Sequence, residues 1–123
     1  MLLEALIAMI IFVIGILGLI GIQAAMVRNT ADAQFRSTAT YLAQQAIGMF
    51  WADPKQSQRD IVIERIAALD GEVANLLPNG EREVFALVDG SHTVRVVVKW
   101  AGPDGIEHNV TLRARVAEND DID

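Results

Sequence analysis

A run of 23 residues without a charge separates Glu4 from Arg28, and it opens with eighteen consecutive apolar or glycine residues, Ala5 to Ile22. A bilayer core of about 30 Å takes roughly 20 helical residues to cross, so this run predicts a membrane-spanning helix. A signal peptide has a basic start, a shorter apolar core and a cleavage site of small residues. This chain instead has an acid at position 4 and no base before the run. A buried helix of a larger soluble fold is disfavoured, because the rest of the chain is too short to surround it.

Apolar and charged residues are segregated along the chain, which is 52% apolar and 21% charged. All ten basic residues and 15 of the 16 acids follow the uncharged run, and four acids lie in the last six residues. The net charge of −6 and the absence of a polybasic stretch exclude nucleic-acid binding as the main function. The absence of cysteine excludes disulfides, thiolate zinc sites and a cysteine nucleophile.

A stripe of apolar residues at spacings of mostly four and three continues the helical pattern beyond the run. Its members are Phe35, Ala39, Leu42, Ala46, Met49 and Phe50. No proline interrupts the chain before Pro54, so we expect one continuous helix from about Leu3 to Trp51, roughly 70 Å long at 1.5 Å per residue. The stripe needs a cover, and we expect Phe35, Leu42 and Met49 to form the helix's share of a helix–sheet core.

Shorter elements follow this helix. The apolar residues between Ile61 and Leu69 predict a short helix that ends near Gly71, and Pro78-Asn79-Gly80 is a turn signal. Three strands are then predicted over 83–89, 93–100 and 110–116, with the Gly102-Pro103-Asp104-Gly105 turn between the last two. In those two strands apolar residues alternate with polar ones, which indicates an antiparallel meander with one wet face. Its dry face is the natural cover for the helical stripe.

The predicted fold class is therefore α+β, with a long N-terminal helix packed on a small antiparallel β-meander. Residues 1–27 form the membrane half of the helix. Residues 28–117 form a globular domain that contains the amphipathic half of the helix, the short helix and the meander. Residues 118–123 form an acidic tail, which we expect to be disordered.

Residues with catalytic chemistry are sparse in this sequence. His92 and His108 lie near strand ends opposite no obvious acid or metal partner, and they lack the cysteines or the spacing of a metal site. There is no GxSxG motif and no phosphate-binding glycine loop. We therefore expect no enzyme, no catalytic residue, no metal and no cofactor.

Glu4 and three glycines are the unusual residues of the membrane helix. A carboxylate inside a bilayer is costly and normally has a partner, whereas one at the interface is favoured by the helix N-terminus; the sequence leaves both interpretations open for Glu4. Gly15, Gly18 and Gly21 recur every three residues. They are either ordinary glycines of a membrane helix or a face where helices approach closely and can unwind locally.

The opening residues Met1 to Ala8 (MLLEALIA), followed by an apolar helix that runs into an amphipathic one, resemble the N-terminus of a mature type IV pilin. The stretch Ile14 to Ala24 (IGILGLIGIQA) is similar, more narrowly, to the PilV-type minor pilins, as are Trp51 and the strands 94–100 and 110–116. The resemblance covers nearly the whole chain, and its specific part lies in the membrane helix.

The resemblance implies roles for particular residues. Members of this family lose a basic leader, and the new N-terminus is methylated, which implies methylation at Met1. The family's glutamate is usually the fifth residue of the mature chain and here it is the fourth, so the methylated residue stays open. The matching role for Glu4 is subunit assembly. Gly15, Gly18 and Gly21 take the place of the proline that often kinks the membrane helix of major pilins.

The resemblance implies a minor pilin that resides in the bacterial inner membrane before assembly, with its globular domain in the periplasm. It would help to prime assembly and end at the tip of a type IV pilus at the cell surface. Its partners would be other minor pilins, the major pilin, the assembly machinery of the inner membrane and a tip adhesin. Two alternatives remain: a minor pseudopilin of a type II secretion system, and a membrane-anchored periplasmic binding domain with an apolar pocket.

Overall fold

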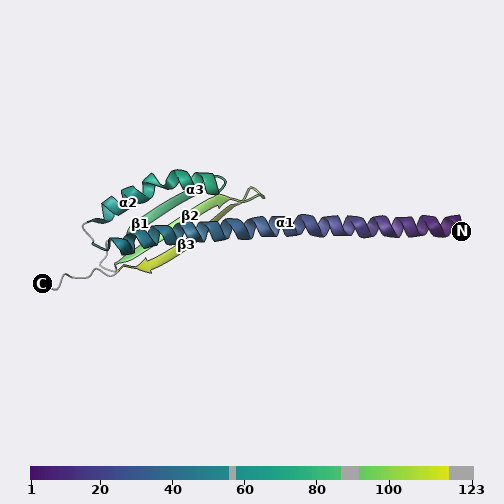
Figure 1. Ribbon diagram of the computed structural model, residues 1–123, viewed down its shortest axis with the longest axis horizontal. Helices are drawn as coiled ribbons and strands as arrows, with labels where there is room; N and C mark the ends of the chain where they lie inside the picture. The colour runs from purple at the N-terminus through teal and green to yellow at the C-terminus, as the bar shows by residue number, and fades with distance from the viewer. Residues whose placement is uncertain (56–57, 87–91, 117–123) are drawn as a thin grey trace. The chain divides into compact units, whose positions relative to one another are not determined.

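The computed structural model describes residues 1–55, 58–86 and 92–116 (Figure 1). In chain order its elements are α1 (Leu2–Ala52), α2 (Arg59–Ala68), α3 (Asp70–Leu76), β1 (Glu81–Ala86), β2 (Thr93–Ala101) and β3 (Glu107–Arg115). The expected α+β fold is confirmed, because a long apolar N-terminal helix packs on a three-stranded antiparallel sheet. The chain divides into two compact units, Met1–Ala33 and Gln34–Asp123, and α1 continues from the first into the second.

The helix α1 is uninterrupted over 51 residues and ends directly before Asp53-Pro54. Proline lacks a backbone N–H and its ring clashes with a continuing helix, which explains the end point. Two threonines within α1 are accommodated without a break. The hydroxyls of Thr30 and Thr40 each donate to the carbonyl four residues earlier, at 2.8 Å.

The second half of α1 buries one stripe of its surface in the core of the second unit. The buried residues of this stripe are Ala39, Leu42, Ala43, Ala46, Ile47 and Phe50. Three of them are alanines, whose small side chains let the helix backbone lie close to the sheet. The sheet's main contribution is the alternate set Val94, Val96, Val98 and Trp100 of β2, each at most 2% exposed. Burying a valine or leucine side chain contributes about 1.5–3 kcal/mol, so this contact holds the unit together.

The sheet is the expected meander, in the order β1-β2-β3. Val96 of β2 stands opposite Val84 on one side and Leu112 on the other, which places apolar residues in rows on the inner face. Strand β3 begins at Glu107, three residues before the predicted start at Val110. The reason is the tightness of the preceding turn, where Gly102 N–H donates to the Ile106 carbonyl at 2.9 Å and pairing starts at once.

Strand β1 begins two residues before the predicted start and is described to Ala86. Residues 87–89 of the predicted strand lie outside the described residues, as does the predicted acidic tail 118–123.

The predicted helix that ends near Gly71 is wrong in its end point, since two helices cover this region. The chain turns at Leu69, whose N–H donates to the Ile66 carbonyl at 3.0 Å, and a second helix, α3, then includes Gly71 and continues to Leu76. Burial of Val73 and Leu77, at 0% and 1% exposure, outweighs the poor helix propensity of one glycine. Leu77 is extended, as expected for a residue that precedes a proline.

Candidate functional site

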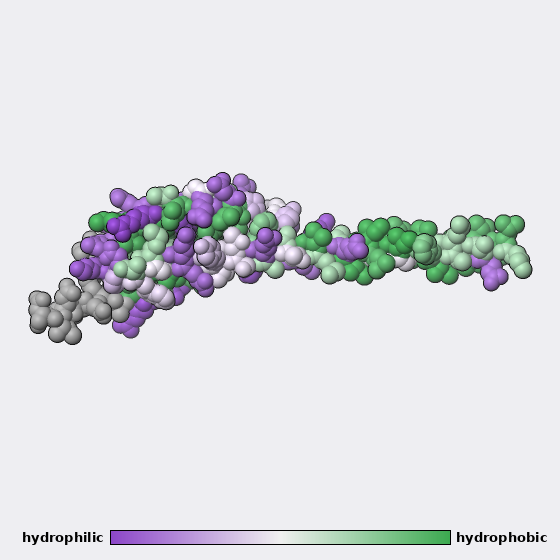
Figure 2. Space-filling model, in the orientation of Figure 1, coloured by the Kyte–Doolittle hydropathy of each residue, from purple (hydrophilic) through white to green (hydrophobic). Residues whose placement is uncertain are grey.

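The surface of the N-terminal unit is apolar and uncovered. Every residue from Met1 to Thr30 is exposed, and apolar side chains dominate this part of the surface (Figure 2). By length and composition α1 is long and apolar enough to cross a membrane, a property that signal sequences near an N-terminus share. A soluble monomer rarely exposes an apolar patch larger than a few hundred Å². This surface therefore requires a cover, which either lipid or other apolar helices can provide.

Glu4 lies in the first turn of α1, where the positive end of the helix dipole favours an acid. It is the only charged side chain before Arg28. Met1 directly precedes the helix, is fully exposed, and accepts a hydrogen bond from Ala5 N–H at its carbonyl, at 3.3 Å. The carboxylate of Glu4 thus stands at the very start of the apolar helix, three residues after Met1.

The three glycines of the membrane half leave open space beside the helix. A Cβ atom built on Gly15, Gly18 or Gly21 would meet nothing within 4 Å. The unbroken helix fixes their directions relative to Glu4. At 3.6 residues per turn, Gly15 points about 20° from Glu4 around the axis, Gly18 about 40°, and Gly21 about 100°. Glu4, Gly15 and Gly18 therefore share one side of α1, with Gly21 at its margin.

The three residues proposed for the helix–sheet core all lie in the second unit. Leu42 is fully buried at 0% exposure, and Phe35 and Met49 are partly buried and pack against the buried cluster. Two further residues of α1, Ala43 and Ile47, belong to the same cluster, although the spacing of the predicted stripe left them out.

Arg82 is a central residue of the globular unit that the sequence analysis missed. It occupies an inward position of β1, in line with Val84 and Ala86, and its side chain is 0% exposed. The predicted strand begins at Glu83, which leaves Arg82 outside it. A strand that starts at Glu81 places the basic side chain of Arg82 in line with the core positions, and this pattern is the signal in the sequence that points to a buried arginine.

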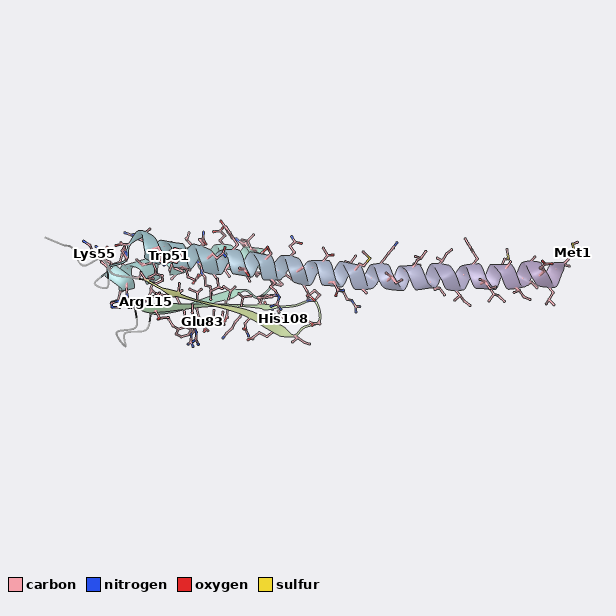
Figure 3. All side chains as sticks on the ribbon, turned by 90° about the horizontal axis from the view of Figure 1, so that it is seen from below. Met1, Trp51, Lys55, Glu83, His108 and Arg115 are labelled. Carbon is pink, nitrogen blue, oxygen red and sulfur yellow. The ribbon has the colours of Figure 1, made fainter. Side chains whose placement is uncertain are left out.

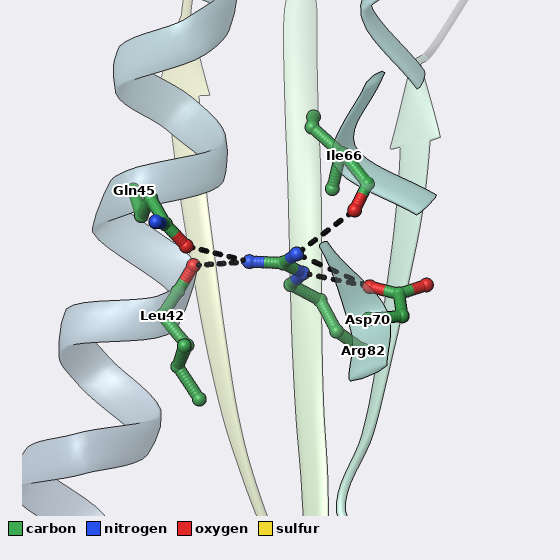
Figure 4. Close-up of polar contacts among 5 residues, drawn as sticks. All are labelled: Leu42, Gln45, Ile66, Asp70 and Arg82. Atoms are coloured by element: carbon green, nitrogen blue, oxygen red, sulfur yellow. Dashed lines mark hydrogen bonds and ion pairs between the residues drawn. The ribbon is translucent and has the colours of Figure 1, made fainter. Parts of the chain in front are cut away.

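The guanidinium of Arg82 is fully hydrogen-bonded (Figure 4). Nη1 donates to the Leu42 carbonyl at 3.2 Å and to Gln45 Oε1 at 3.1 Å, both on α1. Nη2 donates to the Ile66 carbonyl at 3.0 Å on α2, and Nε and Nη2 both reach Asp70 Oδ1 on α3. One side chain of β1 thus ties three helices to the sheet, and the cost of burying its charge is offset by five hydrogen bonds and one carboxylate.

The prediction that His108 faces no acid is wrong. The Gly102-Pro103-Asp104-Gly105 turn brings Asp104 back over the start of β3, where Asp104 Oδ1 lies 3.5 Å from His108 Nε2. The imidazole also stacks on Trp100, with ring centroids 5.8 Å apart. These contacts stabilise the turn between β2 and β3. Within the described ranges, no three histidine, aspartate or glutamate residues are placed to hold a metal ion.

Comparison with known proteins gave no match, whether to a family model, to a curated protein or to a solved structure.

Proposed function

We propose that the chain is a minor pilin, a structural and assembly subunit of a type IV pilus. One observation carries the proposal: an unbroken 51-residue helix is bare and apolar over its first half and packs on a sheet over its second. The bare half holds one carboxylate at its start, on the same side as two glycines. This is the architecture that a subunit needs if its helix leaves a bilayer and enters a bundle of similar helices. The resemblance of residues 1–24 to mature pilins supports the same conclusion.

In this proposal Glu4 sets the position of the subunit. The helices of a pilus core exclude water, so an unpaired carboxylate there costs several kcal/mol. The N-terminal amine of an adjacent subunit is the positive group that lies at the same depth. An ion pair between the two groups strengthens as water leaves, and sliding one helix past the other would strand both charges. The pair therefore fixes the axial offset between neighbours.

The proposal also assigns a location and partners. Before assembly the subunit resides in the bacterial inner membrane with its sheet in the periplasm, and after assembly it lies at or near the pilus tip. Its partners are other minor pilins, the major pilin, the inner-membrane assembly machinery and a tip adhesin.

The test replaces Glu4 by glutamine in the source bacterium, in a strain that lacks the wild-type gene. Glu4→Gln should insert in the membrane and resist protease as the wild type does, yet it should lose co-purification with pilins and reduce the number of surface pili. Asp32→Asn is the matched control, because it neutralises another exposed acid on α1 outside the uncharged run. This control should assemble normally.

Each other outcome has a defined meaning. If Glu4→Gln assembles as well as the wild type, the ion pair is wrong and Glu4 is an interfacial residue of the helix terminus. If loss of the gene reduces protein secretion and leaves pili unchanged, the chain belongs to a type II secretion system. If the wild-type chain co-purifies with no pilin-like protein, the assembly function itself is wrong.

A further inference from the structure

The two outer strands of the sheet, β1 and β3, have different neighbours. Strand β1 contacts the helix α3, whereas β3 pairs with β2 alone. In the described part of the chain, no other strand lies beside β3, so its outer backbone groups lack a ladder partner. An open edge of this kind is a template for one more strand.

A groove of about 570 Å³ runs between this edge and α1. Its apolar part is formed by Ile47 and Trp51 of α1 and by Leu112 and Ala114 of β3. The side chain of Trp51 lies here at 62% exposure, which is unusual for an indole in a folded domain with no partner. Figure 3 labels Trp51 on α1 and Arg115 on β3, both of which line the groove.

The outer side of the same edge is strongly basic. Arg113 and Arg115 are exposed, line the groove and alternate with its apolar residues. Arg113 also stands directly opposite Arg95 of β2, and like charges in this position repel. In the described chain no carboxylate lies within 4.0 Å of these three guanidinium groups. The guanidinium of Arg95 lies over the ring of Phe85, 4.6 Å from its centroid. The repulsion would be relieved by carboxylates supplied from outside.

We propose that the edge of β3 is a docking site for an extended segment of a partner protein in which acidic and apolar residues alternate. Successive side chains of a strand point to opposite faces. A segment paired with β3 would thus insert its apolar residues against Trp51 and Leu112 and direct its carboxylates to Arg113 and Arg115. Main-chain hydrogen bonds give the affinity and the two arginines give the selectivity for acids. The inference uses the globular unit alone and is independent of the proposed pilus function.

The test uses the full chain in detergent micelles and a capped nine-residue peptide of alternating glutamate and valine, as long as β3. Binding is followed by titration calorimetry and by tryptophan fluorescence, to which Trp51 in the groove and the buried Trp100 both contribute. Two control peptides keep the length: one has lysine for glutamate, and one carries N-methyl groups that prevent strand pairing. The protein variants are Arg113→Glu with Arg115→Glu, Trp51→Ala, and the matched control Arg28→Glu with Arg36→Glu, whose arginines are exposed on α1 away from the groove.

The glutamate peptide should bind the wild type and the control variant alike. The Arg113 and Arg115 double variant should bind it about tenfold or more weakly and should gain binding of the lysine peptide. That gain of binding requires a folded sheet, so it separates lost recognition from lost structure. Trp51→Ala and N-methylation should each weaken binding.

Four results would overturn the proposal. Equal binding of the glutamate and lysine peptides would remove the role of the arginines. Unchanged binding of the N-methyl peptide would exclude strand addition. Peptide binding that appears only after removal of residues 118–123 would assign the groove to the chain's own acidic segment. Self-association that the arginine double variant abolishes, without peptide binding, would assign it to a second copy.

Discussion

Arg82 donates two hydrogen bonds to a single oxygen of Asp70, from Nε at 3.2 Å and from Nη2 at 3.1 Å. The Arg82 side chain is 0% exposed, whereas that of Asp70 is 41% exposed. Water therefore reaches the carboxylate but not the guanidinium. The two partners should respond differently to mutation, because only one of them can be solvated when the other is removed.

Asp70→Ala should destabilise the globular unit more than Arg82→Met. The first substitution strands a buried cation, for which about 3 kcal/mol is expected. The second removes the charge, keeps most of the volume and leaves an acid that water can solvate. The buried carbonyls of Leu42 and Ile66 lose Arg82 as a donor, although Ile66 still accepts from the Leu69 N–H, so a cost of about 1–2 kcal/mol is expected. Denaturant melts of the full chain in micelles measure both, with Asp60→Ala, an exposed acid in the first turn of α2, as the control. The reverse order would mean that Arg82 acts by packing and not by charge.

Leu42→Ala should lower the free energy of unfolding by about 2–5 kcal/mol, because Leu42 is fully buried and the cavity will not collapse completely. Tyr41→Ala is the neighbouring control on the same helix, since Tyr41 is 58% exposed, and it should cost no more than about 0.5 kcal/mol. Equal effects in denaturant melts would show that the helix does not bury this stripe in solution.

Two glycines should respond to alanine with opposite signs. Gly71 lies within α3 and a Cβ there would meet nothing within 4 Å, so Gly71→Ala should stabilise by about 0.5–1 kcal/mol through helix propensity. At Gly80 a Cβ would lie 2.7 Å from the Leu77 Cβ and 2.8 Å from the Val73 carbonyl, so Gly80→Ala should cost about 1–3 kcal/mol. Thermal melts that shift in the same direction for both variants would contradict the assigned backbone packing.

Asp104 should give the hairpin a dependence on acidic pH. The Ile106 N–H that donates to Asp104 Oδ1 at 3.0 Å is the main cause that lowers the pKa of this carboxyl below its ordinary 3.8, and His108 beside it also lowers the pKa. Because the pKa is depressed in the folded state, the contribution to stability is present above about pH 4 and is lost as the pH falls through the folded pKa. NMR titration of the carboxyl group measures this pKa directly. A titration midpoint at or above 3.8 would contradict the lowered pKa. A midpoint that persists in Asp104→Asn would also contradict it, because the signal would then come from another group.

The main elements could be predicted because each has a strong periodic signal. The helix α1 follows from an uncharged run, a stripe at spacings of three and four, and a proline at its end. The pairing of β2 with β3 follows from alternation around one glycine-rich turn. The break between α2 and α3 at Leu69 was not predictable in the same way, because it depends on how Val73 and Leu77 pack in the core.

The polar contacts were less accessible from sequence, because they depend on residues brought together from distant positions. Arg82 meets a carbonyl of α1 that lies 40 residues earlier, and no local pattern encodes that contact. The groove beside β3 likewise arises only when α1 crosses the sheet. The position of Glu4 and Gly15 on one side of α1, by contrast, does not depend on distant residues. It follows from helical geometry alone once α1 is known to be unbroken.

This shared side leads to a graded prediction for the membrane half of α1. If neighbouring helices approach on the side that carries Glu4, a leucine at Gly15 or Gly18 should obstruct them, while one at Gly21, at the margin, should obstruct them less. We expect insertion in the membrane to be unchanged for all three, because leucine is apolar and favours helix. If the proposed pilin function is right, recovery of pilin subunits by co-purification should fall for Gly15→Leu and Gly18→Leu and remain higher for Gly21→Leu. Equal recovery for all three variants and the wild type would identify them as ordinary glycines, and the largest loss at Gly21 would place the contact on another side of the helix.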